Sequence, residues 1–251
     1  MAHFFTIVFY QPTLNLLMYF YNTISFHDFG LAIIFLTVVL KLIFWPLGRS
    51  AIKSQKSLQG LQPQIDELKK KYGSDKTGLS RATMDLYKSN KVNPFSSCLP
   101  LLIQLPFLIA VYRVFRDGVS NKLDYVYSFI ARPETINLVS FGFLDLGKPN
   151  VPLAVLAGLA QFWQAKMMIT KQPAVKTPGS KDESMAAIMN KQMLYFMPAI
   201  TIFIGISLPG GLTLYWFVLT LITVLQQLIT FRKKNDVPGE NKTIEGAIVK
   251  Q

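Results

Sequence analysis

The sequence predicts an all-α integral membrane protein with five transmembrane helices around a hydrophilic groove, a cytoplasmic helical hairpin and an N-terminal amphipathic helix. Hydrophobic residues make up 51% of the 251 residues, and the mean hydropathy is +0.32. An ordinary soluble domain of this length is less apolar. The formal net charge of +12 would favour a nucleic-acid partner in a soluble protein. Here the Lys and Arg residues fall between apolar stretches, so they indicate membrane topology first.

Five apolar stretches have the length of roughly 17 to 25 residues that a bilayer requires. They cover residues 31–47, 95–115, 151–169, 192–209 and 212–231. The last two are joined by a tight turn from Leu208 to Gly211.

The distribution of basic residues predicts the orientation. The connection 48–93 has ten Lys or Arg against four acidic residues, whereas 117–150 has three against four. By the positive-inside rule, 48–93 is cytoplasmic, which places the N-terminus outside and the C-terminus inside the cell. The basic segment 170–191 and the tail 232–251 then fall on the cytoplasmic side as well. Arg113 and Arg116 on the outer face weaken this bias without reversing it.

Residues 1–30 contain no Lys or Arg and form the first predicted unit, ahead of a core at 31–231. Asn15, Tyr19 and Asn22 recur at helical spacing, which predicts an amphipathic helix on the outer membrane surface. The alternative is a sixth span over residues 4–26, which Pro12 would interrupt.

A helical hairpin is expected over residues 49–91. Its first arm has apolar residues three and four apart, the spacing of a two-stranded coiled coil, at Leu58, Leu61, Ile65, Leu68 and Tyr72. Pro63 should bend this arm and Gly73 should end it. A solvated loop with helical ends is the plainer alternative. As a functional element, the hairpin would contact lipid head groups or an incoming chain near the cytoplasmic entrance.

Lys41 is an ionisable residue inside the first predicted span, where a charge costs from about 2.5 kcal/mol upward and therefore suggests function. Thr37 precedes it by one helical turn and faces the same side. The alternative is snorkelling past Leu47, roughly 9 Å away along a straight helix.

Other spans carry polar faces too. The clearest lies on the fifth span, at Thr213, Trp216, Thr220, Thr223 and Gln227. The third span adds Gln161 and Gln164, and the second adds Ser97 and Gln104. Each residue alone would be read as an interhelical hydrogen bond or, for Trp216, an interfacial anchor. Together they predict a hydrated cavity around Lys41.

No nucleotide-binding or hydrolase motif is present, and His3 and His27 both precede the first span. The single cysteine, Cys98, can form neither an internal disulfide nor a cysteine-rich metal site. We therefore expect no enzyme activity, cofactor or metal. A cationic cavity suits a substrate with a short acidic tail and an apolar segment, which can slide into the lipid.

Several motifs resemble the YidC/Oxa/Alb membrane protein insertase family in its short bacterial form. They are KLIFWPL from Lys41, LQPQIDELKKKYG from Leu61, NPFSSCLPLLIQLPFLIAVYRV from Asn93, QFWQAKM from Gln161 and LYWFVLTLITVLQQ from Leu214. The resemblance implies a groove closed to the outside but open to cytoplasm and lipid, which receives nascent membrane proteins.

The resemblance also implies site residues. The family's intramembrane positive charge falls on Lys41, where most bacterial members carry arginine, so bidentate recognition is lost but attraction of an acidic tail remains. Thr37, Gln164 and Trp216 match its substrate-contact positions, and Gln104, Tyr215 and Thr220 complete the candidate groove. The Sec translocon and the ribosome are further partners of the family, although the short tail here argues against strong ribosome tethering.

A small-solute transporter or channel is the alternative function, because it also needs polar stripes and a buried charge. The five stretches show no inverted repeat that would support it. An assembly factor that only chaperones membrane subunits would look similar in sequence, but it would tolerate loss of the charge on Lys41.

Overall fold

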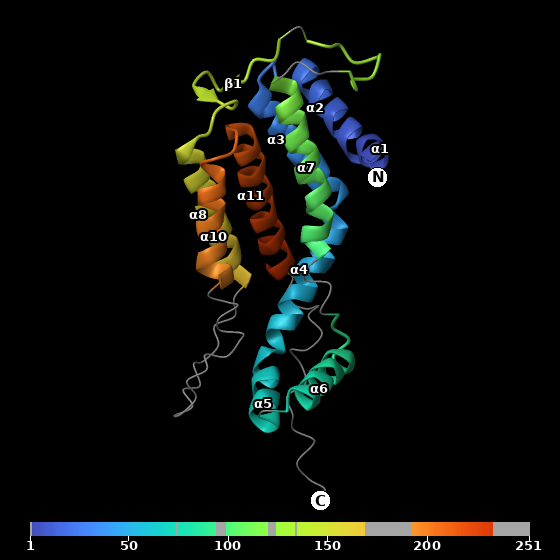
Figure 1. The fold of residues 1–251 in the computed structure, drawn as a ribbon, viewed down its shortest axis with the longest axis vertical. Coiled ribbons are helices and arrows are strands. Elements are labelled where there is room, and N and C mark those ends of the chain that lie inside the picture. Colours follow the sequence, from blue (N-terminus) through green and yellow to red (C-terminus); the bar gives the residue numbers. More distant parts are fainter. Residues whose placement is uncertain are drawn as a thin grey trace, which may run out of the picture.

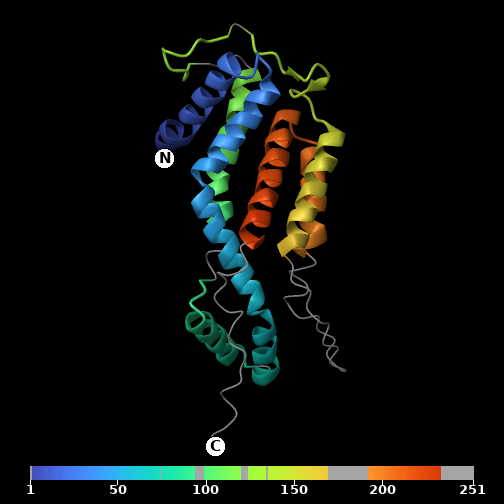
Figure 2. The same ribbon diagram turned by 180° about the vertical axis from the view of Figure 1, so that it is seen from behind.

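The molecule is a helical bundle with a helical arm at one end and a loop cap at the other (Figures 1 and 2). The computed structural model describes residues 2–73, 75–93, 99–119, 124–133, 135–168 and 192–232. The predictions for Ser97, Cys98, the connection 170–191 and the tail from residue 233 lie outside the described residues.

The N-terminal region is helical and joins the core of the bundle. Its segments are α1 (Ala2–Phe5), the π-helical η1 (Thr6–Tyr10) and α2 (Gln11–Thr23). α2 packs against α3 and α7. The expectation that Asn15 lies on an outward polar face is wrong, because Asn15 is only 3% exposed. Its amide binds the loop that crosses the bundle end, donating to the Tyr125 carbonyl at 2.9 Å and accepting from the Tyr127 N–H at 2.7 Å.

The predicted first span is broken by a sharp bend. α3 (Phe29–Ile43) and α4 (Trp45–Gly60) meet at Phe44 at an angle of 69°. Pro46 explains the break, because it has no N–H to donate to the Leu42 carbonyl and its ring would clash there. The helix predicted to run straight to Leu47 therefore turns before that residue.

The arm beyond the bend ends in a helical hairpin. α5 (Gln62–Tyr72) packs against α6 (Lys76–Ser89), as the apolar spacing predicts. Gly73 ends α5 with a positive φ of 51°, a conformation that glycine adopts without strain. Pro63 stands in the first turn of α5, just after the break between α4 and α5. Asp75 caps α6 by accepting from the Gly78 N–H at 2.9 Å.

The rest of the bundle consists of α7 (Leu99–Val119), α8 (Val151–Met168), η3 (Gln192–Phe196), α10 (Met197–Gly205) and α11 (Gly210–Arg232). α11 lies in the middle and contacts α3, α4, α7 and α8 (Figure 1). At its start, a Cβ on Gly211 would overlap the Phe115 ring of α7, so any larger residue would force that ring to move.

One helix among the described residues is long and apolar enough to cross a membrane by itself, Gly210–Phe231 of α11. α3 and α4 would qualify together if the bent pair is counted as one span.

The cap at the opposite end from the arm is formed by the connection from residue 124 to α8. Its short strands β1 (Val139–Ser140) and β2 (Leu144–Asp145) pair antiparallel, with Val139 opposite Asp145. The start of α11 holds this cap, because the Gly210 N–H donates to the Lys148 carbonyl at 2.9 Å. The core beneath it is aromatic and includes Phe29 and Phe115, whose rings meet edge to face.

Candidate functional site

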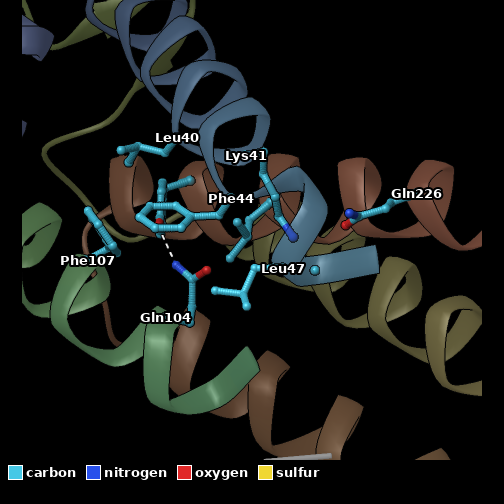
Figure 3. Close-up of a pocket in the computed structure, with 10 residues that line it drawn as sticks. Leu40, Lys41, Phe44, Leu47, Gln104, Phe107 and Gln226 are labelled. Carbon is cyan, nitrogen blue, oxygen red and sulfur yellow. Dashed lines mark hydrogen bonds between the residues drawn. The ribbon is translucent and has the colours of Figure 1, made fainter. Parts of the chain in front are cut away.

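A pocket lies where α3, α4, α7 and α11 meet, beside the bend at Phe44 (Figure 3). Its volume is about 70 Å³, and its walls are Leu40, Lys41, Phe44, Leu47, Gly48, Gln104, Phe107, Tyr215, Leu219 and Gln226. Most of these side chains are apolar, so the few polar groups determine what the pocket can bind.

Lys41 provides the positive charge of the pocket. It is half-buried in the last turn of α3, where its Nζ donates to the Thr223 hydroxyl of α11 at 2.7 Å. The same hydroxyl donates to the Leu219 carbonyl at 2.7 Å, so its oxygen is free to accept from the ammonium. In the described part of the chain, Lys41 has no acidic partner. This contact with a neutral hydroxyl leaves the charge available for an anionic ligand.

Gln104 and Tyr215 form a second polar pair in the pocket. The Gln104 amide of α7 donates to the phenol oxygen of Tyr215 on α11, as the dashed line in Figure 3 marks. Tyr215 is almost completely buried, so the amide supplies a polar partner that lipid cannot. The bond also joins α7 to α11.

Gln226 closes the pocket behind the bend. It is 1% exposed, and its Nε2 donates to the Trp45 carbonyl at the start of α4 at 2.8 Å. Gly48 allows this approach, since a Cβ there would lie 2.9 Å from both terminal amide atoms of Gln226. The sequence analysis missed Gln226. Its only signal was the combination of Pro46 and Gly48 after Lys41, which indicates a helix break with a close helix crossing.

The structure brings together only part of the predicted site. Lys41, Gln104 and Tyr215 line the pocket, whereas Thr37, Gln164, Trp216 and Thr220 do not. Thr37 is fully buried and its hydroxyl donates to the Ile33 carbonyl at 2.6 Å. Thr220 is also buried and donates to the Trp216 carbonyl at 2.8 Å. Because threonine hydroxyls can bond within their own helix, a polar stripe in the sequence need not form a wet surface.

The third predicted span contributes a hydrogen bond between helices instead of a pocket wall. Thr201 of α10 donates to the side-chain oxygen of Gln161 on α8. This is the plain interhelical role that single polar residues have in membranes.

The polar groups of the pocket can bind a ligand through hydrogen bonds and one ionic contact. Its functional groups are one ammonium, two amides and one phenol on an apolar wall. Across the described ranges of the chain, no group of three or more His, Cys, Asp or Glu side chains could hold a metal ion. A cation beside amides suits a carboxylate, which can accept from all of them.

The sequence of the chain is similar to a known protein family and to several named proteins. The family model described as "60Kd inner membrane protein" matches residues 1–237. The protein named membrane protein insertase YidC from Pelobacter propionicus is 34% identical over 231 residues, which cover 90% of this chain and 39% of that protein. The protein of the same name from Syntrophus aciditrophicus is 35% identical over 217 residues, 86% of this chain and 35% of that protein.

A shorter relative matches over most of its length. The membrane protein insertase YidC of Fusobacterium nucleatum is 35% identical over 207 residues, which cover 82% of this chain and 87% of that protein. The chain thus spans less than two fifths of the longer relatives but nearly all of this one.

Proposed function

Because the chain belongs to the 60Kd inner membrane protein family, the YidC/Oxa1 family, we propose that it inserts other proteins into a bacterial cell membrane and assists their folding. The relatives carry the name membrane protein insertase, and the pocket has the binding groups that this function needs. Insertion of this kind involves no enzymatic step.

The proposed topology has five spans. They correspond to α3, α7, α8, η3 with α10, and α11, with the cap outside and the arm from α4 to α6 in the cytoplasm. Two observations support it: the basic connection 48–93 forms the arm, and the bundle separates that arm from the cap (Figure 2).

In the proposed mechanism, Lys41 attracts the acidic or polar tail of an arriving membrane protein. At an effective dielectric constant of about 20, a carboxylate about 4 Å from an ammonium gains roughly 4 kcal/mol before desolvation is subtracted. The hydrogen bond from Lys41 to Thr223 must be exchanged for the new one, which lowers the net gain further. Binding is therefore reversible, as transfer requires.

Release is driven by the substrate's own apolar segment. Burying a Leu, Ile or Phe side chain gains about 1.5–3 kcal/mol, so a span of about twenty apolar residues exceeds the cost of giving up the pocket. The apolar walls at Leu40, Phe44, Phe107 and Leu219 let such a segment pass without a polar barrier. No nucleotide is required.

We propose nascent membrane proteins and the lipid bilayer as the partners, with the Sec translocon and the ribosome as further candidates. Thr37, Gln164, Trp216 and Thr220 would then contribute to helix packing around the groove, while Lys41, Gln104 and Tyr215 contact the substrate.

The observation that carries this proposal is the half-buried ammonium of Lys41, whose hydrogen-bond partner among the described residues is a neutral hydroxyl. Site-specific photocrosslinking to a stalled nascent membrane protein tests it. Photoreactive residues at the wall positions Leu40, Leu47 and Phe107, which leave the charge on Lys41 intact, should crosslink to the nascent chain. A matched probe at Leu159, which is 57% exposed on α8 and outside the pocket, should crosslink less. Equal crosslinking at Leu159, or none at the pocket positions, would contradict the proposal.

A further inference from the structure

The capped end of the bundle presents aromatic side chains outward. Phe26 is 90% exposed, Phe143 is 82% exposed and Phe129 is 80% exposed. They lie in the α2–α3 turn, the β1–β2 turn and the connection before β1, all at the top of the molecule in Figure 1. Phenylalanine at such exposure, repeated on three segments of one end, marks an apolar contact surface.

The backbone adopts strained conformations where two of these segments turn. Phe26 has a φ of 53° and Phe141, next to the tip of the β1–β2 turn, has a φ of 54°. L-residues with bulky side chains rarely adopt this region, so the surrounding contacts must hold them there. His27, which follows Phe26, also has a positive φ, of 62°. Each turn thus presents an exposed phenylalanine with positive φ, since Phe141 is 46% exposed.

Asp28 joins the two turns. Its carboxylate accepts from the Ser140 hydroxyl, from the Phe141 N–H at 2.7 Å and from the Leu31 N–H in the first turn of α3 at 3.0 Å. The connection before β1 is held as well, because the Asn22 amide donates to the Ala131 carbonyl at 2.7 Å. The aromatic side chains therefore project outward from turns that these hydrogen bonds hold in place.

We infer that Phe26, Phe129, Phe141 and Phe143 form an aromatic rim that sits in the boundary between head groups and acyl chains of the leaflet at the capped end. The occupant is lipid because the rim continues the apolar outer faces of the spans, where Leu156 and Phe203 are likewise exposed. Phenylalanine is among the apolar side chains that interfacial segments bury at the boundary between head groups and acyl chains.

The rim fixes the depth of the pocket. Lys41 lies about 20 Å along α3 from Asp28, at about 1.5 Å per residue. If the rim marks one edge of a hydrocarbon layer about 30 Å thick, Lys41 lies roughly 5 Å past its middle, nearer the arm. The inference depends on the chain being embedded in a bilayer and not on the proposed insertase activity.

Spin-label accessibility in liposomes tests the rim. The full-length protein carries Cys98→Ser and one nitroxide-labelled cysteine at Phe26, Phe143 or Lys148. The Lys148 side chain is 81% exposed at the same end and serves as the water-facing control. Labels at Phe26 and Phe143 should be relaxed severalfold more by oxygen than by a water-soluble nickel chelate, and the label at Lys148 should show the reverse.

The depth is tested by a label at Leu42, which is 60% exposed next to Lys41. It should be deeper than the labels at Phe26 and Phe143, and Phe143→Ser together with Phe26→Ser should shift it measurably. Nickel access at the rim equal to that at Lys148 would overturn the inference, as would low access of both reagents, which would mean that a protein covers the rim. An unchanged depth at Leu42 in the double variant would overturn its role in setting the position of Lys41.

Discussion

The Lys41 ammonium of α3 is hydrogen-bonded to the Thr223 hydroxyl of α11 at 2.7 Å. One turn further along α11, Gln226 donates to the Trp45 carbonyl at 2.8 Å. These bonds fall on opposite sides of the break at Phe44, so a single turn of α11 holds both α3 and α4 at their 69° bend. The same turn of α11 therefore holds both the Lys41 ammonium and the start of the arm at Trp45.

Removing the charge on Lys41 should abolish insertion of single-span substrates with acidic tails. Lys41→Ala loses the attraction, whereas Lys41→Arg keeps it. Even if the net electrostatic gain is only about 1.4 kcal/mol, its removal weakens substrate binding tenfold. We therefore expect the alanine variant to bind the substrate tail at least tenfold more weakly. Complementation in cells depleted of their insertase, with protease protection of the substrate, measures this. Full activity of Lys41→Ala would support a plain assembly factor instead.

Removing the hydroxyl of Thr223 should have a smaller effect on insertion, because the charge on Lys41 remains. Thr223→Val leaves the ammonium without its acceptor, and we expect the free energy of unfolding in detergent to fall by about 1 kcal/mol. Thr223→Ser keeps the hydroxyl and is the matched control. If Thr223→Val is as inactive in insertion as Lys41→Ala, the hydroxyl and not the charge is the essential group.

Much of the fold follows from local sequence. The hairpin could be predicted because its apolar residues repeat every three or four positions. In addition, Gly73 ends the first arm with a positive φ that other residues rarely adopt. Lys41 could be predicted to line a polar pocket because a charge inside an apolar stretch is costly unless polar groups surround it. Both signals act over one or two helical turns, which a single sequence displays directly.

Which residues line the pocket could not be predicted in this way. Gln226 and Gln227 are adjacent and both 1% exposed, yet Gln226 lines the pocket and Gln227, which the polar stripe contained, does not. The rotation of α11 against α4 decides between them, and it depends on the bend at Phe44. Thr37 lies outside the pocket walls, and its hydroxyl is satisfied inside its own helix, which its position in the sequence does not reveal.

The cap should lose stability at low pH through Asp28. Burial raises the pKa of Asp28, but hydrogen bonds from Ser140 and from the Phe141, Leu31 and Gly30 N–H groups outweigh it and leave the pKa below its ordinary value of 3.8. A carboxyl with a depressed folded-state pKa contributes stability that is present above the unfolded pKa and lost as pH falls through the folded one. Melting temperatures between pH 6 and 3 should therefore fall more steeply for the natural protein than for Asp28→Asn. Equal slopes would exclude this contribution.

Gly48 and Gln226 should be energetically coupled across the helix crossing. A Cβ at position 48 would lie 2.9 Å from the Gln226 amide atoms, so Gly48→Ala should destabilise the protein by about 1–3 kcal/mol through overpacking. Gln226→Ala removes the obstructing amide as well as the bond to Trp45. In that background the added methyl has room, and the cost of Gly48→Ala should shrink by more than about 0.5 kcal/mol.

A double-mutant cycle of thermal unfolding in detergent measures this coupling. Gly60→Ala is the control in the same helix, because nothing lies within 4 Å of a Cβ added there. Its effect should be small and identical with and without Gln226→Ala. Additive costs for Gly48→Ala and Gln226→Ala would mean that the two residues do not meet, and that α11 does not hold the bend from behind the pocket.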